Sequence, residues 1–328
     1  MSAWYTVLIV LGSILVVGVI SEIVLRATAR KFDPKNKHCY ITGGSTGLGK
    51  AVAIELAKRG AHITIVARRL EELNKAKTEI ESHCTSNCQK VICISSDCTD
   101  HDSTVKALDE AIEKHGKVPE YVFTCAGASY PGLFIEQSVD VFEKNMKLNY
   151  FGTLYTVHQA VNKMVGSNIK GNVVLVGSTL SMLGLIGYSQ YTPTKFAIRG
   201  LAESLRNELK AYGINVSVYF PGTILSPGFE TENLTKPQIT KDIEGADSGL
   251  SPEQCAKALI KGLSRGEVAI TSDIVSLLFR VSSRGMMPTN NFVLDSILAF
   301  VAWIAFIPWR WYADSLVVNY GKSMLSNN

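Results

Sequence analysis

Residues 38–49, HCYITGGSTGLG, decide the fold of this chain. A short run with β-branched and aromatic side chains enters a glycine-rich turn, and the amphipathic stretch KAVAIELAKRG follows directly. Glycines permit a tight turn and a close backbone approach, so a pyrophosphate can bind the N–H groups at the helix N-terminus. Glycine-rich turns are common, but one placed between a strand and a helix predicts a dinucleotide site.

The rest of the chain continues the alternation of strand and helix that this segment begins. Strands are expected at HITIVA, KVICISS, EYVFTCAG, NVVLVGS and NVSVYFPG, and helices at LEELNKAKTEIES, around 142–164 and at about 192–211. Repeated βαβ units bury a parallel sheet between helices. We therefore predict an α/β fold of the Rossmann type, with a doubly wound, mostly parallel sheet of six or more strands. Residues 222–252 are rich in proline and glycine and are expected to be an irregular lid.

The glycine turn also fits a second interpretation. Gly43, Ser45 and Gly47 match G-x-S-x-G, the nucleophile elbow of serine hydrolases, which also lies between a strand and a helix. A hydrolase needs a histidine and an acid after Ser45. The later histidines, at positions 62, 83, 101, 115 and 158, lie in or near the first half of the chain, with no evident partner. The hydrolase stays as an alternative.

The end of the second expected strand indicates which dinucleotide would bind. HITIVA ends in Ala67, Arg68 and Arg69, where a site that prefers NAD would usually place an acid for the ribose 2′-hydroxyl. Two guanidinium groups suit a 2′-phosphate instead. The alternative is that both arginines are merely solvated at a strand end. The prediction is NADPH.

A constellation in the second half of the chain indicates proton transfer to a carbonyl. Ser178 ends the expected strand NVVLVG, and Lys195 follows Tyr191 by four positions. If a helix begins near Tyr191, the two side chains share one face, and Pro193 is tolerated in the first turn. A nearby ammonium is expected to lower the pKa of the phenol, which can then exchange a proton with a developing alkoxide. The Ser178 hydroxyl would hold the carbonyl oxygen.

Together these motifs resemble the short-chain dehydrogenase/reductase family over about residues 36–270. The matching signposts occur in order, namely TGGSTGLG, Asp97, the CAG of residues 125–127, Asn149, Ser178, the YTPTK of residues 191–195 and the PG of FPGTILS.

The resemblance implies roles for further residues. Asp97 would lie at the adenine, Ala126 and Gly127 would line the cofactor cleft, and Asn149 would hold a water in a proton relay through Lys195. The implied cofactor-binding set is Gly43, Ser45, Thr46, Gly47, Leu48, Gly49, Arg68, Arg69, Asp97, Cys98, Ala126, Gly127, Tyr191, Lys195, Pro221, Gly222 and Ile224. The implied catalytic set is Asn149, Ser178, Tyr191 and Lys195, with no metal. Two positions depart from the family pattern, Thr124-Cys125 in place of two asparagines and Cys98 in place of a small aliphatic residue.

Within the family, the segment PGFETENLTKP (residues 227–237) is similar to members that reduce a long-chain lipid ketone in sphingolipid synthesis at the endoplasmic reticulum. Steroid or retinal reductases and 3-ketoacyl reductases are alternatives of the same class. An inactive NADP-binding membrane sensor or scaffold is an alternative of another class. The four intact catalytic positions argue against it.

The N-terminus predicts a membrane anchor within residues 1–30. Residues 4–25 carry one charge, Glu22, and would span ~33 Å as a helix. Basic residues follow at 26, 30, 31, 35 and 37, which places the catalytic domain of residues 36–270 on the cytosolic side. A buried core helix is the alternative. On this topology the sequon at Asn233 is expected to stay unmodified.

Residues 271–328 form a second apolar region. The charge-free part from 296 to 309 has a length at which spanning, re-entrant and buried segments cannot be told apart. Trp303, Trp309, Trp311 and Tyr312 suit a bilayer interface. We expect membrane association, with a plain packing helix as the alternative.

Composition narrows the classes of partner. The chain has 328 residues, is 46% hydrophobic and carries a net charge of +4, with basic residues gathered after the apolar N-terminus. That pattern favours a membrane surface over nucleic acid as the binding partner. Assembly into a homo-oligomer is possible as well. The seven cysteines are odd in number and their spacings do not match paired zinc ligands, so we expect free thiols and no metal.

Overall fold

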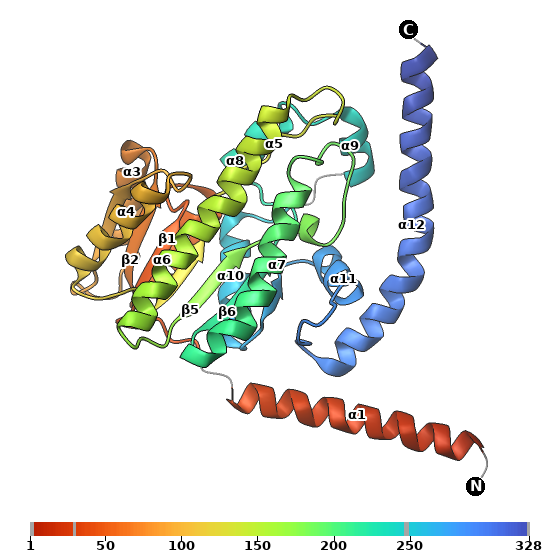
Figure 1. The fold of residues 1–328 in the computed structure, drawn as a ribbon, viewed down its shortest axis with the longest axis horizontal. Helices are drawn as coiled ribbons and strands as arrows, with labels where there is room; N and C mark the ends of the chain where they lie inside the picture. The colour runs from red at the N-terminus through yellow and green to blue at the C-terminus, as the bar shows by residue number, and fades with distance from the viewer. Residues whose placement is uncertain (1–2, 29–30, 246–248, 327–328) are drawn as a thin grey trace.

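The computed structural model describes residues 3–28, 31–245 and 249–326. Its centre is a seven-stranded sheet, in which neighbouring strands are parallel and follow the order β3-β2-β1-β4-β5-β6-β7 (Figure 1). The strands are β1 (His38–Thr42), β2 (His62–Ala67), β3 (Val91–Ser95), β4 (Tyr121–Thr124), β5 (Asn172–Val176), β6 (Asn215–Phe220) and β7 (Ala269–Thr271). The order reverses between β1 and β4, where open α/β sheets bind nucleotides beyond the carboxyl ends of the strands.

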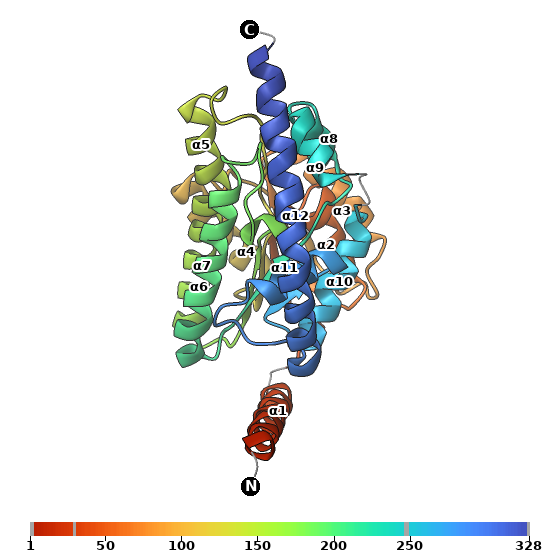
Figure 2. The same ribbon diagram turned by 90° about the vertical axis from the view of Figure 1, so that its right-hand side faces the viewer.

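Helices cover both faces of the sheet, as Figure 2 shows. One face packs against α2 (Gly47–Ala57), α3 (Leu70–Glu81) and α10 (Pro252–Ser264), and the other against α4 (His101–His115), α6 (Gly152–Gly166) and α7 (Thr192–Glu208). Successive side chains of β1 point to opposite faces of the sheet, so Cys39 and Ile41 pack on the α2 side and Tyr40 packs on the α6 side. The predicted doubly wound fold is confirmed.

The helix expected around residues 142–164 is not a regular α-helix. It consists of α5 (Val139–Asn145), a π-helical turn η1 (Met146–Phe151) and α6. Such turns insert an extra residue and often occur at functional sites. Here the π turn contains Asn149, which is 1% exposed. Two short 3₁₀ turns, η2 (Thr179–Ser181) and η3 (Leu209–Tyr212), complete this half of the molecule.

The lid expected to be irregular at 222–252 contains two short helices. The segment holds α8 (Pro227–Asn233) and α9 (Gln238–Glu244), while residues 246–248 lie outside the described part of the chain. Ser226 caps α8, and Pro227 begins it. The prolines that suggested a loop therefore mark the starts of helices, where the missing N–H costs nothing.

Two long helices lie outside this layered domain (Figure 1). They are α1 (Ala3–Thr28) and α12 (Phe292–Ser326), and their segments Trp4–Val24 and Phe292–Lys322 are long and apolar enough to cross a membrane. The apolar run expected to end at Trp309 thus continues as one helix. Residues 1–2 and 29–30 of the expected anchor, Arg30 among them, are outside the described residues.

The start of α12 is fixed to α11 and to α1. A buried ion pair joins Arg280 of α11 (Ile274–Ser282) to Asp295, with nitrogen–oxygen distances of 2.7 and 3.0 Å. Glu22 of α1 accepts a hydrogen bond from the Phe292 amide at 2.5 Å. The two apolar helices α1 and α12 therefore meet at the first residue of α12.

Candidate active site

The sequence-predicted proton-transfer residues converge at the carboxyl end of β5. Ser178 follows β5 and begins η2, while Tyr191 is the N-cap of α7, with a proline in the first turn. The Ser178 hydroxyl lies close enough to the Tyr191 phenol to lower its pKa. Lys195, one turn further along α7, has its Nζ 5.5 Å from the centroid of the Tyr191 ring. The three groups therefore surround one point beyond the sheet.

Burial sets the protonation of this group. Lys195 is 5% exposed and donates to the Val176 carbonyl at 3.0 Å; burial lowers the pKa of its ammonium to about 8. Burial raises the pKa of Tyr191 above its usual range, the charge of Glu232 raises it further, and the neighbouring Ser178 hydroxyl opposes the rise. The expected lowering by Lys195 is therefore not seen: desolvation dominates the pKa of the phenol, and Lys195 is not among the groups that shift it. A phenol held in its protonated form is a proton donor.

Asn149 connects the π turn to two neighbouring segments. Its Oδ1 accepts from the Ala128 amide at 2.9 Å, and its Nδ2 donates to the Ala128 carbonyl at 3.0 Å and to Thr194 of α7 at 3.1 Å. A Cβ on Gly127 would lie 3.0 Å from Asn149 Oδ1 and 3.7 Å from Lys195 Nζ. The two side chains therefore flank the same backbone, and only glycine leaves this space open.

The glycine turn forms a cradle before α2. Gly43 has φ +68°, and a Cβ there would lie 2.8 Å from the Ala126 amide nitrogen. A Cβ on Gly49 would lie 2.3 Å from the Gly43 carbonyl oxygen. Gly47, with φ +52°, faces Ser226 at the start of the lid. Ser45 and Thr46 are half-buried in the turn, and Leu48 is buried behind it.

The residues expected at the adenosine end also lie together. Arg68 and Arg69 are exposed immediately after β2. Asp97 accepts hydrogen bonds from the amide and hydroxyl of Thr99, both at 2.9 Å. Burial raises the pKa of the Cys98 thiol to about 11, while the charge of Arg68 opposes that rise. Arg68 thus lies close enough to the Cys98 thiol to influence its pKa.

The segment from Pro221 to Ile224 closes the other side of the crevice. The Pro221 carbonyl accepts from the Thr179 amide at 2.9 Å and hydroxyl at 3.1 Å, and the Gly222 amide donates to Asp273 at 3.3 Å. Ser276 bridges Asp273 and Thr179, at 2.7 and 2.6 Å. Ile224 pairs with Leu250.

Asp273 and Ser276 were missed by the sequence analysis. Asp273 is the N-cap of α11 and accepts from the Ser276 amide at 2.8 Å. A capping residue just before an apolar helix is a sequence signal that could have identified it. Its second role, holding Gly222, depends on a contact between segments 51 residues apart and has no local signature.

A polar cluster under the lid was also missed. Tyr188 donates to Glu232 of α8 at 2.6 Å and is hydrogen-bonded to Glu244 of α9 at 2.9 Å. Lys236 pairs with the same two carboxylates, at 3.4 and 2.8 Å. The ring centroids of Tyr188 and Tyr191 are 6.1 Å apart, so the cluster adjoins the proton donor. The available signal was the i, i+4 spacing of Glu232 and Lys236 in the charged segment.

The assembled crevice fits a nicotinamide dinucleotide. Three glycine positions leave the space that a Cβ would fill, and the exposed arginines flank one end. Within the described part of the chain, the Thr124 hydroxyl at the end of β4 is buried without a hydrogen-bond partner. A polar group beside the crevice is thus left for a ligand to satisfy.

Comparison with known proteins agrees with this geometry. Residues 37–237 match the short chain dehydrogenase family. A 3-ketodihydrosphingosine reductase of Cryptococcus neoformans is 40% identical over 88% of this chain and 86% of its own length. One of Bos taurus is 41% identical over 77% and 76%.

Solved structures show the same fold. A short chain dehydrogenase from Mycobacterium paratuberculosis bound to NAD superposes with a TM-score of 0.65 at 22% identity, covering 75% of this chain and 99% of that one. LigD of Sphingobium gives a TM-score of 0.63 at 26% identity, covering 74% and 91%. The chain therefore belongs to the short-chain dehydrogenase family and is an oxidoreductase that uses a nicotinamide cofactor.

Proposed function

We propose that this protein reduces 3-ketodihydrosphingosine to dihydrosphingosine with NADPH, in the synthesis of sphingolipids. The observation that carries the proposal is the assembled group of Ser178, Tyr191 and Lys195 in a chain whose similar relatives bear that enzyme's name. The three residues indicate the class of reaction, and the names of the relatives indicate which ketone is reduced.

The residues act on the substrate oxygen. Bound NADPH supplies the hydride to the carbonyl carbon. The Ser178 hydroxyl donates a hydrogen bond to the carbonyl oxygen, and Tyr191 transfers its proton as the alkoxide develops. The Lys195 ammonium stabilises the resulting phenolate. Asn149 is bonded to Thr194 of α7, and its role in this proposal is to hold a water in a proton relay through Lys195.

An assay of NADPH oxidation by the purified protein in detergent tests this function. Keto-sphingoid bases should be reduced, and steroids, retinal and 3-ketoacyl thioesters should react far more slowly. Better turnover of one of these rivals would reassign the substrate. Inactivity with every ketone would favour a cofactor-binding sensor or scaffold, and ester cleavage without any nicotinamide would favour a hydrolase.

We propose that Arg68 and Arg69 select NADPH over NADH, because both are exposed where the 2′-phosphate would lie. Replacing both with alanine removes charge-assisted hydrogen bonds worth ~1.5 to 3 kcal/mol, about ten- to a hundredfold in affinity. The KM for NADPH should rise by that factor, while the KM for NADH should change little. Lys75, exposed on the helix α3 that follows the two arginines, supplies a control as Lys75→Ala. An equal loss with both cofactors would indicate a structural role.

We propose three parts for the chain, a membrane anchor at 1–30, a catalytic domain at 36–270 and a membrane-associated region at 271–328. The catalytic domain lies on the cytosolic face of the endoplasmic reticulum. The apolar helices α1 and α12 support association with the bilayer, and the basic residues after α1 support the orientation.

Protease treatment of intact microsomes is expected to digest the catalytic domain, since that domain faces the outside of these vesicles. Asn233, on the exposed segment α8, should carry no glycan. Detergent-lysed microsomes provide the control for protease access. Protection of the domain in intact vesicles, or a glycan on Asn233, would reverse the orientation.

A further inference from the structure

The lid cluster of Tyr188, Glu232, Lys236 and Glu244 carries more negative than positive charge. Two carboxylates face a single ammonium, that of Lys236, whose side chain is 2% exposed. The phenol of Tyr188 adds hydrogen bonds but no charge. The cluster therefore has capacity for a second cation, and Lys236 shows that its carboxylates already accept one ammonium.

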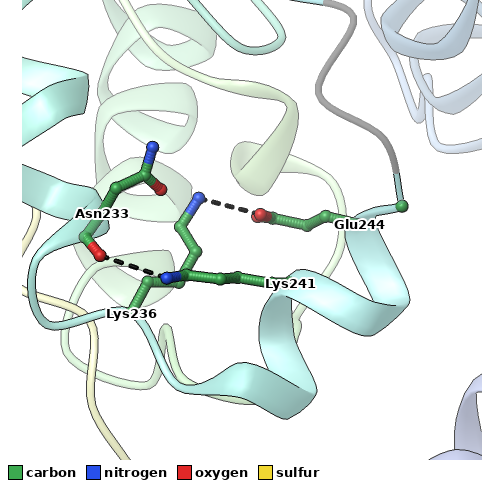
Figure 3. Close-up of a pocket in the computed structure, with 5 residues that line it drawn as sticks. Asn233, Lys236, Lys241 and Glu244 are labelled. Carbon is green, nitrogen blue, oxygen red and sulfur yellow. Dashed lines mark hydrogen bonds and ion pairs between the residues drawn. The ribbon is translucent and has the colours of Figure 1, made fainter.

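The cluster also borders open space. A pocket of about 300 Å³ is lined by Asn233, Lys236, Lys241, Glu244 and Gly245. In Figure 3 the Lys236 ammonium points to Glu244, and Lys241 points to the Asn233 carbonyl. Lys236 also lies over the rings of Phe229 and Tyr188, at 4.8 and 5.7 Å from their centroids. The Lys236 ammonium is thus fixed between α8 and α9.

Of the two carboxylates in the cluster, Glu232 is the one whose charge affects the proton donor Tyr191. Tyr188, which donates to it, has its ring 6.1 Å from that of Tyr191 and accepts the Tyr191 amide with its carbonyl at 3.0 Å. The charge of Glu232 is felt at the Tyr191 phenol. The side chain of Glu232 retains 19% exposure, whereas that of Lys236 is closed off. Glu232 therefore combines partial exposure with an electrostatic influence on Tyr191.

We propose that Glu232, held by Tyr188, binds the substrate's ammonium and so selects 2-amino ketones over other long-chain ketones. This inference rests on the proposed function. In 3-ketodihydrosphingosine the amino group is on the carbon next to the carbonyl, so its partner can lie no farther from the group that binds the oxygen than two hydrogen-bond lengths plus the nitrogen–oxygen separation in the substrate, roughly 9 Å. Glu232, on α8, is linked to the neighbourhood of Tyr191 through Tyr188, which contacts both residues. The bond between Glu232 and the ammonium orients the ketone toward Ser178.

The test compares two ketones of equal chain length, 3-ketodihydrosphingosine and its analogue without the amino group. Each is assayed with wild type, Glu232→Gln and the control Glu230→Gln, which removes the same charge from an exposed position of α8. The measured quantity is the ratio of kcat/KM for the amino ketone to that for the analogue. Wild type and Glu230→Gln should share a high ratio, and Glu232→Gln should lower it at least tenfold.

The ratio separates binding of the ammonium from damage to the lid, since a misplaced lid slows both ketones alike. An unchanged ratio in Glu232→Gln, or a wild-type ratio near one, would overturn the assignment while leaving the reductase function standing. Failure of wild type to reduce either ketone would instead overturn the proposed function. An N-acetylated amino ketone, which keeps the nitrogen but loses the charge, should behave like the analogue.

Discussion

Replacing Tyr191 with phenylalanine is expected to lower kcat for ketone reduction by ~10²- to 10⁴-fold, because the variant keeps the ring but removes the transferable proton. Burial holds the pKa of the wild-type phenol above its usual range, so the proton is present throughout the neutral range. A neighbouring residue cannot easily replace it. Ser178 is a weaker acid, and Lys195 is turned toward the Val176 carbonyl. The measurement is single-turnover oxidation of NADPH with saturating ketone.

The matched control is Tyr155→Phe, which removes a hydroxyl from α6 at a half-buried position outside the crevice. It should retain wild-type turnover, and both variants should show the same thermal unfolding midpoint as the wild type. A Tyr191→Phe protein that turns over at a rate close to the wild type would remove Tyr191 from the role of proton donor.

The fold could be predicted because its determinants are local. The glycine turn lies between a strand and a helix, and each further βαβ unit repeats the same change of period from two to 3.6 residues. Strands buried on both faces, such as β1, show as short apolar runs. The lid was the exception, because Ser226 and Pro227 carry both a turn signal and a helix start, and the sequence does not separate them.

The proton-transfer residues could be predicted for the same reason. Lys195 shares a helix face with Tyr191, and Ser178 ends a recognisable strand. The direction of the Tyr191 pKa could not, because spacing gives the distance to an ammonium but not the degree of burial. The links from Asp273 to Gly222 and from Tyr188 to Glu244 join distant segments, so only the folded chain reveals them.

The position of α12 indicates which apolar surface a long alkyl tail of the substrate would contact. The inner face of α12 packs on α11, where Phe279 stacks on Phe306 at 4.4 Å, and α12 also contacts the lid helix α9. Its outer face exposes Phe300 and Ile304, at 61% and 51%. A tail that leaves the site beside α9 meets α12, whose exposed apolar side chains can hold it together with the surrounding lipid.

Shortening the alkyl chain of the ketone by four carbons is accordingly expected to lower kcat/KM more than a hundredfold. Each buried methylene contributes about 0.8 kcal/mol, so the loss is ~3 kcal/mol. Substrate is supplied below its aggregation concentration at a fixed detergent concentration, so that the measured dependence reports transfer from water. Nearly equal values across the series would mean that the tail gains nothing from the protein or its surrounding lipid, and would refute the lipid-ketone assignment.

Replacing Leu298, Phe300 and Ile304 with serine should flatten that dependence on chain length, because it removes apolar surface from α12. Reduction of a small water-soluble ketone should stay unchanged, since the three side chains lie on a helix outside the catalytic layers. Val165→Ser, at an exposed apolar position of α6, is the control and should leave the dependence intact. An intact dependence in the triple variant would place the contact with the tail elsewhere, and an equal loss with both ketones would mean that α12 supports the fold of the site instead of its lipid specificity.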